Sequence, residues 1–233
     1  MSKNLIIAID GPAGSGKSTT AKIVAQKLDF LYIDTGAMYR AMTYLAIRNK
    51  ILEDHNRIVD LAKKCEIELD FIDGVTQIKV NGEDITDQIR TIEVNKNVSL
   101  ISKIKGLRNI LVNKQREMGT KGNGVVMEGR DISTVVFPDA DVKVFLTAMI
   151  DERAKRRAKE YAENGTHVSI NEIKTNLQNR DNIDSNRESS PLKKAEDALV
   201  VDTSNLTIDQ QVDLILKEVH KTADKLGIEI SIK

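Results

Sequence analysis

One short stretch near the N-terminus, GPAGSGKST at positions 11–19, combines residue types that can hold a phosphate. It fits the pattern G-x-x-x-x-G-K-[ST], in which glycines let backbone N–H groups turn inward around the bound group. Lys17 would reach the β- and γ-phosphates of a nucleotide, and the Ser18 hydroxyl would ligate Mg²⁺. The stretch predicts a P-loop, with nucleotide contacts from Gly11, Pro12, Ala13, Gly14, Ser15, Gly16, Lys17, Ser18 and Thr19.

Two further groups of polar residues follow short apolar runs. The sequence DTGAMYR ends in Arg40, which offers a bidentate fork for a second phosphate but could equally pair with a neighbouring carboxylate. In the sequence EGRD, Glu128 could hold Mg²⁺ through water and Arg130 could hold a phosphate. Asp131 could accept a hydrogen bond from an amino group. Each of these residues, taken alone, could also be an ordinary cap or loop residue.

The elements that must position these groups are indicated by the apolar residues. Short apolar runs without clean alternation predict strands buried on both faces of a parallel sheet, at 5–9, 30–33, 124–127, 142–146 and 198–201. Helical patterns lie between them, as in the apolar stripe of Ala21, Val24, Ala25 and Leu28. The sequence therefore predicts an α/β fold with a P-loop NTPase-type parallel sheet flanked by helices. Ligands bind at the carboxyl ends of such strands, where the three polar groups would meet.

Residues 66–85 depart from this alternation. Apolar and polar side chains alternate there on either side of turns at Asp73–Gly74 and Asn81–Gly82. This pattern predicts a small antiparallel β insert within a helical region.

The segment 151–190 is charged throughout. Arg153, Arg156 and Arg157 are spaced i, i+3 and i+4, which places them on one face of a predicted helix. A solvated charged helix is the ordinary interpretation of this pattern. Phosphoryl transfer, however, needs cations around the transferred group and a means of excluding water. The segment therefore predicts a mobile, arginine-rich lid.

Composition excludes several classes of function. The 233 residues carry 30 % charged side chains and a formal net charge of +0, so no overall field favours nucleic acid or membrane as a partner. The single cysteine, Cys65, excludes an internal disulfide and suits a reducing compartment. No apolar stretch approaches the ~18 residues of a membrane span. We expect a cytoplasmic protein without nucleic-acid or membrane partners.

The P-loop alone does not separate kinases from other nucleotide-binding proteins. A GTPase should show N-K-x-D, but NKNV lacks the aspartate, and the only D-x-x-G lies at 224–227, far from a switch position. The chain has little room for the partner domain of a motor. A small-molecule phosphotransferase is favoured. A regulatory module that binds nucleotide without acceptor-dependent turnover remains an alternative of a different class.

The order and spacing of four motifs, GPAGSGKST, DTGAMYR, EGRDISTVVFPDA and NRDNIDSNR, resemble bacterial cytidylate kinases over about residues 4–220. The resemblance implies transfer of a phosphoryl group from ATP to CMP or dCMP with Mg²⁺. It implies Mg²⁺ contacts from Ser18 and Glu128, and an acceptor phosphate held by Arg40 and Arg130. The implied catalytic residues are Lys17, Arg130, Arg153 and Arg157. The implied contacts to the cytosine base are Thr35, Arg108, Asp131 and Arg187, and those to the pentose are Ser99, Arg180 and Asp184.

The resemblance also implies three parts and a monomer. These are a P-loop core (1–34, 112–150 and 191–233), a nucleoside monophosphate-binding domain (35–111, with the β insert at about 66–90) and a lid (151–190). Three residues depart from the common family pattern: Thr35 replaces serine, Glu128 replaces aspartate and Ser133 replaces glycine. A kinase of the same fold acting on UMP, dTMP or shikimate is the remaining alternative. Those acceptors lack the amine that Asp131 would meet.

Overall fold

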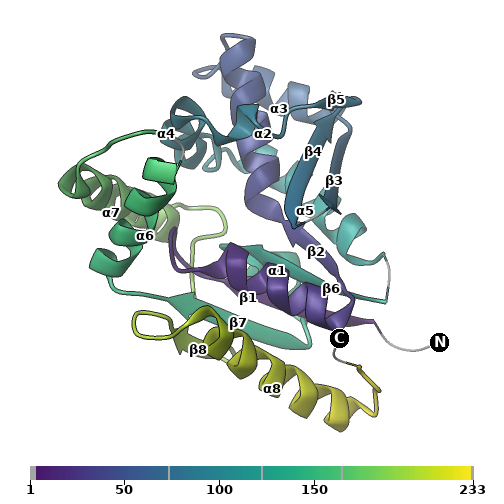
Figure 1. The fold of residues 1–233 in the computed structure, drawn as a ribbon. Coiled ribbons are helices and arrows are strands. Elements are labelled where there is room, and N and C mark those ends of the chain that lie inside the picture. The colour runs from purple at the N-terminus through teal and green to yellow at the C-terminus, as the bar shows by residue number, and fades with distance from the viewer. Residues whose placement is uncertain (1–3, 73, 122, 164, 232–233) are drawn as a thin grey trace.

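A computed structural model describes residues 4–231 of the chain apart from 73, 122 and 164, and shows a five-stranded parallel sheet (Figure 1). The strand order is β2-β6-β1-β7-β8, with β1 in the centre, and every pairing is parallel. The strands are β1 Leu5–Asp10, β2 Leu31–Asp34, β6 Gly124–Gly129, β7 Val142–Thr147 and β8 Leu199–Asp202. The predicted parallel sheet is confirmed. The strands β2 and β6 lie on one side of β1, and β7 and β8 lie on the other. The strand order therefore changes direction at β1, and in such sheets ligands bind at the carboxyl end of the strand where this happens.

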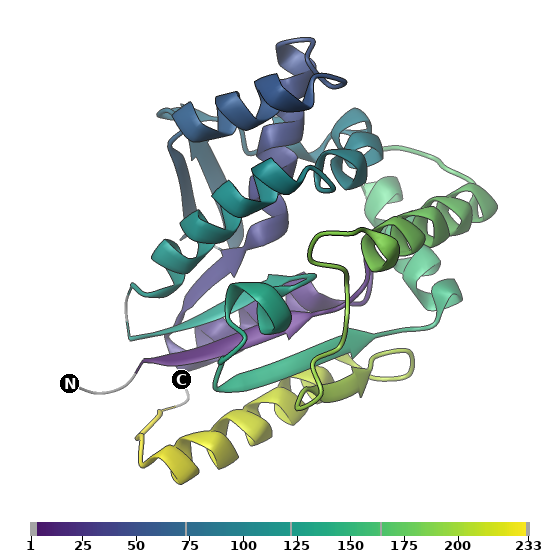
Figure 2. The ribbon, with the colours of Figure 1, turned by 180° about the vertical axis from the view of Figure 1, so that it is seen from behind.

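Helices cover both faces of the central strands β1 and β6, as their apolar runs predict, whereas the edge strand β8 leaves Val200 48% exposed. Ile7 and Ile9 of β1 face α1 (Lys17–Leu28) and α8 (Ile208–Leu226), whereas Ala8 faces the opposite side. The stripe predicted on α1 is buried as expected. The opposite face is covered by α5 (Lys105–Gly119) and by η2 (Ile132–Val136), a single π-helical turn. Figure 2 shows η2 lying against the sheet on that side.

A second body lies above the sheet in Figure 1. Its antiparallel sheet has the order β3-β4-β5 (Ile67–Ile72, Val75–Val80 and Glu83–Asp84), which confirms the predicted β insert. Residue 73 of the expected Asp73–Gly74 turn lies outside the described residues. The accompanying helices are α2 Thr35–Arg48, α3 His55–Lys64, η1 Gln88–Arg90, α4 Ile92–Ile101 and α5. The buried apolar residues of this body form a cluster separate from those beside the parallel sheet.

Two helices, α6 (Ile150–Glu163) and α7 (Ile170–Asn186), occupy the charged segment and lie beside the P-loop (Figure 1). Ala154, Ile173 and Leu177 bury a small apolar cluster between them, together with Ala13 of the P-loop. The pair is thus held to the core by few apolar contacts, as its polar sequence predicts.

The C-terminal segment is ordered against the sheet. Helix α8 begins with a capping box at Thr207 and Gln210 and ends at Gly227, whose φ of 67° suits glycine. None of the helices in the described part of the chain has the length and apolar character needed to cross a membrane.

Candidate active site

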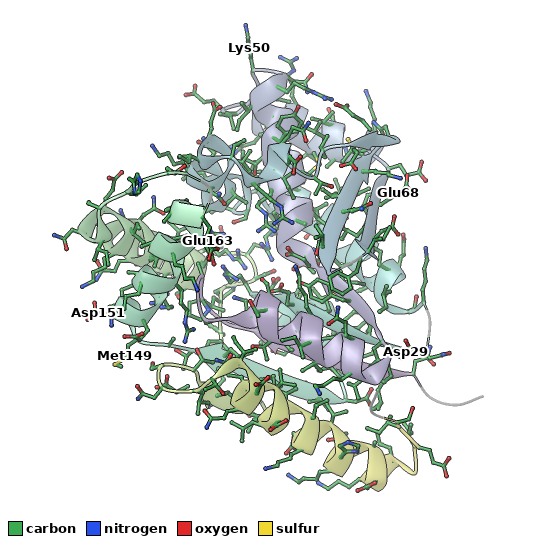
Figure 3. All side chains as sticks on the ribbon, viewed as in Figure 1. Asp29, Lys50, Glu68, Met149, Asp151 and Glu163 are labelled. Carbon is green, nitrogen blue, oxygen red and sulfur yellow. The ribbon has the colours of Figure 1, made fainter. Side chains whose placement is uncertain are left out.

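A cleft of about 1090 Å³ lies between the end of β1, the second body (β3–β5 with its helices) and the helix pair α6–α7. Figure 3 shows nitrogen-tipped side chains gathered in this space. The predicted site residues on its wall are Ala13, Gly14, Gly16, Lys17, Ser18, Thr19, Thr35, Arg40, Ser99, Arg108, Glu128, Arg130, Asp131, Arg157, Arg180, Asp184 and Arg187. The structure does not place Gly11, Pro12, Ser15 or Arg153 on this wall. Residues from 13 to 187 thus meet in one cleft.

The P-loop connects the end of β1 to the start of α1. A Cβ on Gly11 would lie 2.0 Å from the carbonyl oxygen of Leu146 in β7, so only glycine fits there. Gly14 and Gly16 have positive φ values of 75° and 92°, which turn the backbone around the site. The N-terminus of α1 follows directly and favours an anion.

Lys17 lies in the loop and is buried. Its Nζ donates to the carbonyl oxygen of Pro12 at 2.8 Å. Burial lowers the pKa of Lys17 to about 7, and the positive charge of Arg130 adds to the shift, while Glu128 opposes it. A phosphate bound here would favour the charged form of the lysine.

Glu128 ends β6 beside Lys17 and is buried. It accepts a hydrogen bond of 2.5 Å from the Tyr32 hydroxyl and another from the Ser18 hydroxyl. Burial raises the pKa of Glu128, as does the nearby carboxylate of Asp34, while Lys17 opposes both. The two predicted Mg²⁺ contacts are therefore adjacent.

Arg40 forms an ion pair with Asp34 at 2.7 Å. The other oxygen of Asp34 caps α2 by accepting from the backbone N–H of Ala37 at 3.1 Å. Arg40 burial is incomplete, and its guanidinium lines the cleft. The carboxylate partner considered in the sequence is thus present, and it aims the arginine into the cleft.

Asp131 lies between two buried arginines. Arg108 donates to one carboxylate oxygen, and Arg187 lies 3.7 Å from the other. The guanidinium of Arg108 also lies 5.1 Å from the centre of the Tyr39 ring. Because all these groups line the cleft, a ligand with both donors and acceptors could exchange hydrogen bonds with them.

A second buried group joins Arg130 to α7. The Nε of Arg130 donates to Asp184 of α7 at 3.0 Å, and Arg187 approaches the same carboxylate at 3.8 Å. Burial lowers the pKa of Arg180 to about 9, to which the charge of Arg130 contributes. The cations of this wall outnumber the carboxylates they pair with, as an anionic ligand requires.

The three arginines of α6 point to different places. Arg153 is buried, pairs with Asp181 at 2.7 Å and donates to the carbonyl oxygen of Ala13 at 3.3 Å. Arg156 donates to the hydroxyl and the carbonyl oxygen of Thr203, and it also lines the cleft. Arg157 lines the cleft and pairs with Glu160 at 2.8 Å. The predicted contact with the transferred group therefore fits Arg157 in this conformation, whereas Arg153 joins the helix pair to the P-loop.

Several cleft residues were not singled out from the sequence. Lys22 of α1 and Arg90 of η1 both line the cleft. Lys22 donates to the carbonyl oxygen of Gly74 and lies against the rings of Tyr32 and Phe71. No motif marks these side chains, because their position depends on where the β insert packs against the core.

The parallel sheet, the P-loop at the end of its central strand and the cation-lined cleft define a P-loop nucleotide-binding protein. A family model described as cytidylate kinase matches residues 7–221. Cytidylate kinases of Desulforamulus reducens and Bacillus subtilis are 52% and 48% identical to this chain. Each alignment covers 95% of this chain and 99% of the relative. The chain belongs to the cytidylate kinase family.

A solved structure shows the same fold at low sequence identity. An uncharacterized protein from Eubacterium ventriosum superposes with a TM-score of 0.54 and 14% identity, covering 94% of this chain and 99% of the other. This likeness extends over nearly the whole chain and concerns the fold alone.

Proposed function

We propose that the chain transfers the γ-phosphoryl group of ATP to CMP or dCMP, giving ADP and CDP or dCDP, in pyrimidine nucleotide metabolism. The observation that carries this proposal is the buried Asp131, held by Arg108 and Arg187 on the wall of a cleft that begins at the P-loop. Its carboxylate can accept from the exocyclic amine of cytosine, and the arginines can donate to the ring carbonyl and nitrogen. Uracil has no such amine.

The phosphates are held by cations on both sides of the reacting bond. Lys17 and the P-loop amides bind the donor phosphates. Arg40 and Arg130 align the acceptor phosphate, whose oxygen attacks the γ-phosphorus as the bond to the β-phosphate oxygen breaks. Arg157 offsets the charge that develops on the transferred group. No general base is needed, because the attacking phosphate oxygen is already anionic.

The residues near the P-loop fit Mg²⁺. Its oxygen ligands would be the Ser18 hydroxyl and, through water, the buried Glu128, which already contact each other. No group of three or more His, Cys, Asp or Glu side chains that could hold a metal occurs in the described part of the chain. Mg²⁺ commonly uses one or two carboxylates together with waters and substrate phosphates, and it would supply neutralisation of phosphate charge.

The proposal divides the work among three parts of the chain. The core at 1–34, 112–150 and 191–233 would bind ATP, and 35–111 would bind the acceptor. The helix pair within 151–190 would close over both substrates and exclude water, which prevents hydrolysis of ATP. Its few apolar contacts to the core support such movement.

We further propose that the enzyme acts as a cytoplasmic monomer, which its cysteine usage and the family resemblance support.

The variant Asp131→Asn tests the cytosine assignment. The amide keeps only one acceptor oxygen, so either Arg108 or the amine of cytosine would face an N–H donor. We expect kcat/KM for CMP to fall about 100-fold, whereas kcat/KM for UMP should fall much less. Steady-state rates with both acceptors measure this ratio. Circular dichroism and the KM for ATP provide controls for folding. An unchanged CMP-to-UMP ratio in a folded variant would contradict the role given to Asp131.

A further inference from the structure

Asp10 is a buried carboxylate that the proposed mechanism does not use. It is the last residue of β1, it has 0% exposure, and it directly precedes the first glycine of the P-loop. Its carboxylate accepts from the backbone N–H groups of Ile132 and Ser133 at 2.9 and 2.8 Å, and from the Ser133 hydroxyl at 2.5 Å. No ion pair with Asp10 is found among the described residues. Three donors from one turn therefore surround this charge.

The turn bound by Asp10 is the one that carries Asp131. The carbonyl oxygen of Asp131 accepts from the backbone N–H groups of Val135 and Val136 at 2.9 and 3.1 Å, which closes the π-helical turn η2. Single π-helical turns often occur at functional sites. The first N–H groups of such a turn lack partners within it, and Asp10 satisfies two of them. The backbone on the C-terminal side of Asp131 is thus fixed by a side chain of the neighbouring strand.

The far end of the same turn has a separate anchor. Arg116 of α5 donates to the carbonyl oxygens of Val136 and Val135 at 2.9 and 2.7 Å. This arginine is exposed and does not line the cleft. Asp10 therefore acts at the end that carries the base-reading carboxylate, and Arg116 acts at the opposite end.

We infer that Asp10 is a positioning residue for acceptor recognition: it fixes the turn at 131–133 so that the Asp131 carboxylate meets the base at a set distance from the P-loop. This inference rests on the proposed function. Asp10, which directly precedes the P-loop, thereby also positions Asp131, the residue that recognises the acceptor base. Ser133, a departure from the common family pattern, adds a third donor to the same carboxylate. Supporting groups of this kind determine how well a recognition side chain is held.

The variant Asp10→Asn removes the charge and keeps the size of the side chain. One amide oxygen can still accept, but the amide nitrogen then faces a backbone N–H donor, so the turn must shift. We expect the KM for CMP to rise about tenfold and the CMP-to-UMP ratio of kcat/KM to fall about fivefold, since a misplaced hydrogen bond loses discrimination. A rise in the KM for ATP larger than the rise in the KM for CMP would overturn the positioning role, because the charge of Asp10 also acts on Lys17.

Two further variants make the test specific. Arg116→Met loosens the same turn at the other end, and it should lower the melting temperature while leaving the CMP-to-UMP ratio unchanged. Ser133→Ala leaves the charge of Asp10 in place, removes one donor, and should raise the KM for CMP about threefold with an unchanged KM for ATP. If Asp10→Asn does not fold, Ser133→Ala alone carries the test.

The outcomes separate this inference from the proposed function. A wild-type protein that uses CMP and UMP equally would overturn the proposed function and this inference together. A selective wild type with an unchanged KM for CMP and an unchanged ratio in Asp10→Asn would overturn the positioning role alone. An equal loss of selectivity in Arg116→Met would show that any loosening of the turn has this effect, and would also overturn it.

Discussion

At the scale of single residues, the cleft holds its charges in pairs that a substrate can rearrange. Arg40 is paired with Asp34, and Arg130 is paired with Asp184. An acceptor phosphate would compete with these carboxylates for the same guanidinium groups. The pairs keep long side chains directed into the cleft, and this lowers the conformational entropy lost when a substrate binds.

The pKa of Lys17 predicts that nucleotide binding takes up a proton above neutral pH. With a pKa of about 7, the buried lysine of the free protein is mostly neutral at pH 8. Bound phosphates stabilise its charged form and raise this pKa, so binding of a nucleotide should take up a large part of a proton at pH 8 and weaken as pH rises. Titration calorimetry in two buffers of different ionisation enthalpy measures the uptake. Lys17→Met should show almost none, and a wild type without uptake would refute the prediction.

The sequence predicted which residues form the site, but it did not predict the side chains with which they pair. The three motifs at strand ends were enough to predict the clustering of Lys17, Arg40 and Glu128, because parallel strands end at one edge. Spacing on a helix did not reveal that Arg153 pairs with Asp181, because Asp181 lies on another helix. Asp10 had a visible signal, a charge ending a buried strand, but its partners in the turn after β6 are 122 and 123 residues away.

At the scale of elements, the P-loop and β7 are in van der Waals contact through Gly11. We predict that Gly11→Ala reduces nucleotide binding more than 10-fold and lowers stability, because the added Cβ would lie 2.0 Å from a carbonyl oxygen of β7 and the loop must shift. Nucleotide affinity by titration and the melting temperature test this. Gly227→Ala is the matched control, since a Cβ there meets nothing within 4 Å, and its positive φ costs only stability. Equal nucleotide affinity in Gly11→Ala and wild type would be inconsistent with this account of the loop.

Most helices and strands were predicted from the sequence, because the local pattern of apolar residues agrees with how each element packs in the fold. The central strands β1 and β6 are buried on both faces, and the β insert alternates as an antiparallel sheet should. The π-helical turn η2 was not predicted, because its five residues, ISTVV, are too few to show a helical period. Its conformation depends on Asp10 at one end and Arg116 at the other, both distant in sequence.

At the scale of the whole molecule, three bodies meet around one cleft. The second body has its own apolar cluster, and the helix pair α6–α7 has a small one (Figure 1). Bodies with separate cores can move relative to each other, as a kinase that must exclude water requires. We therefore expect acceptor-dependent turnover to require all three bodies.

The most direct test of this account is ADP release from ATP with Mg²⁺ in the presence of CMP, dCMP, UMP, dTMP, shikimate or no acceptor. We predict fast release with CMP and dCMP, weak release with UMP, and almost none with the other acceptors or without one. Equal rates with CMP and UMP would contradict the reading of cytosine by Asp131. Release that does not depend on the acceptor would contradict phosphoryl transfer between nucleotides altogether.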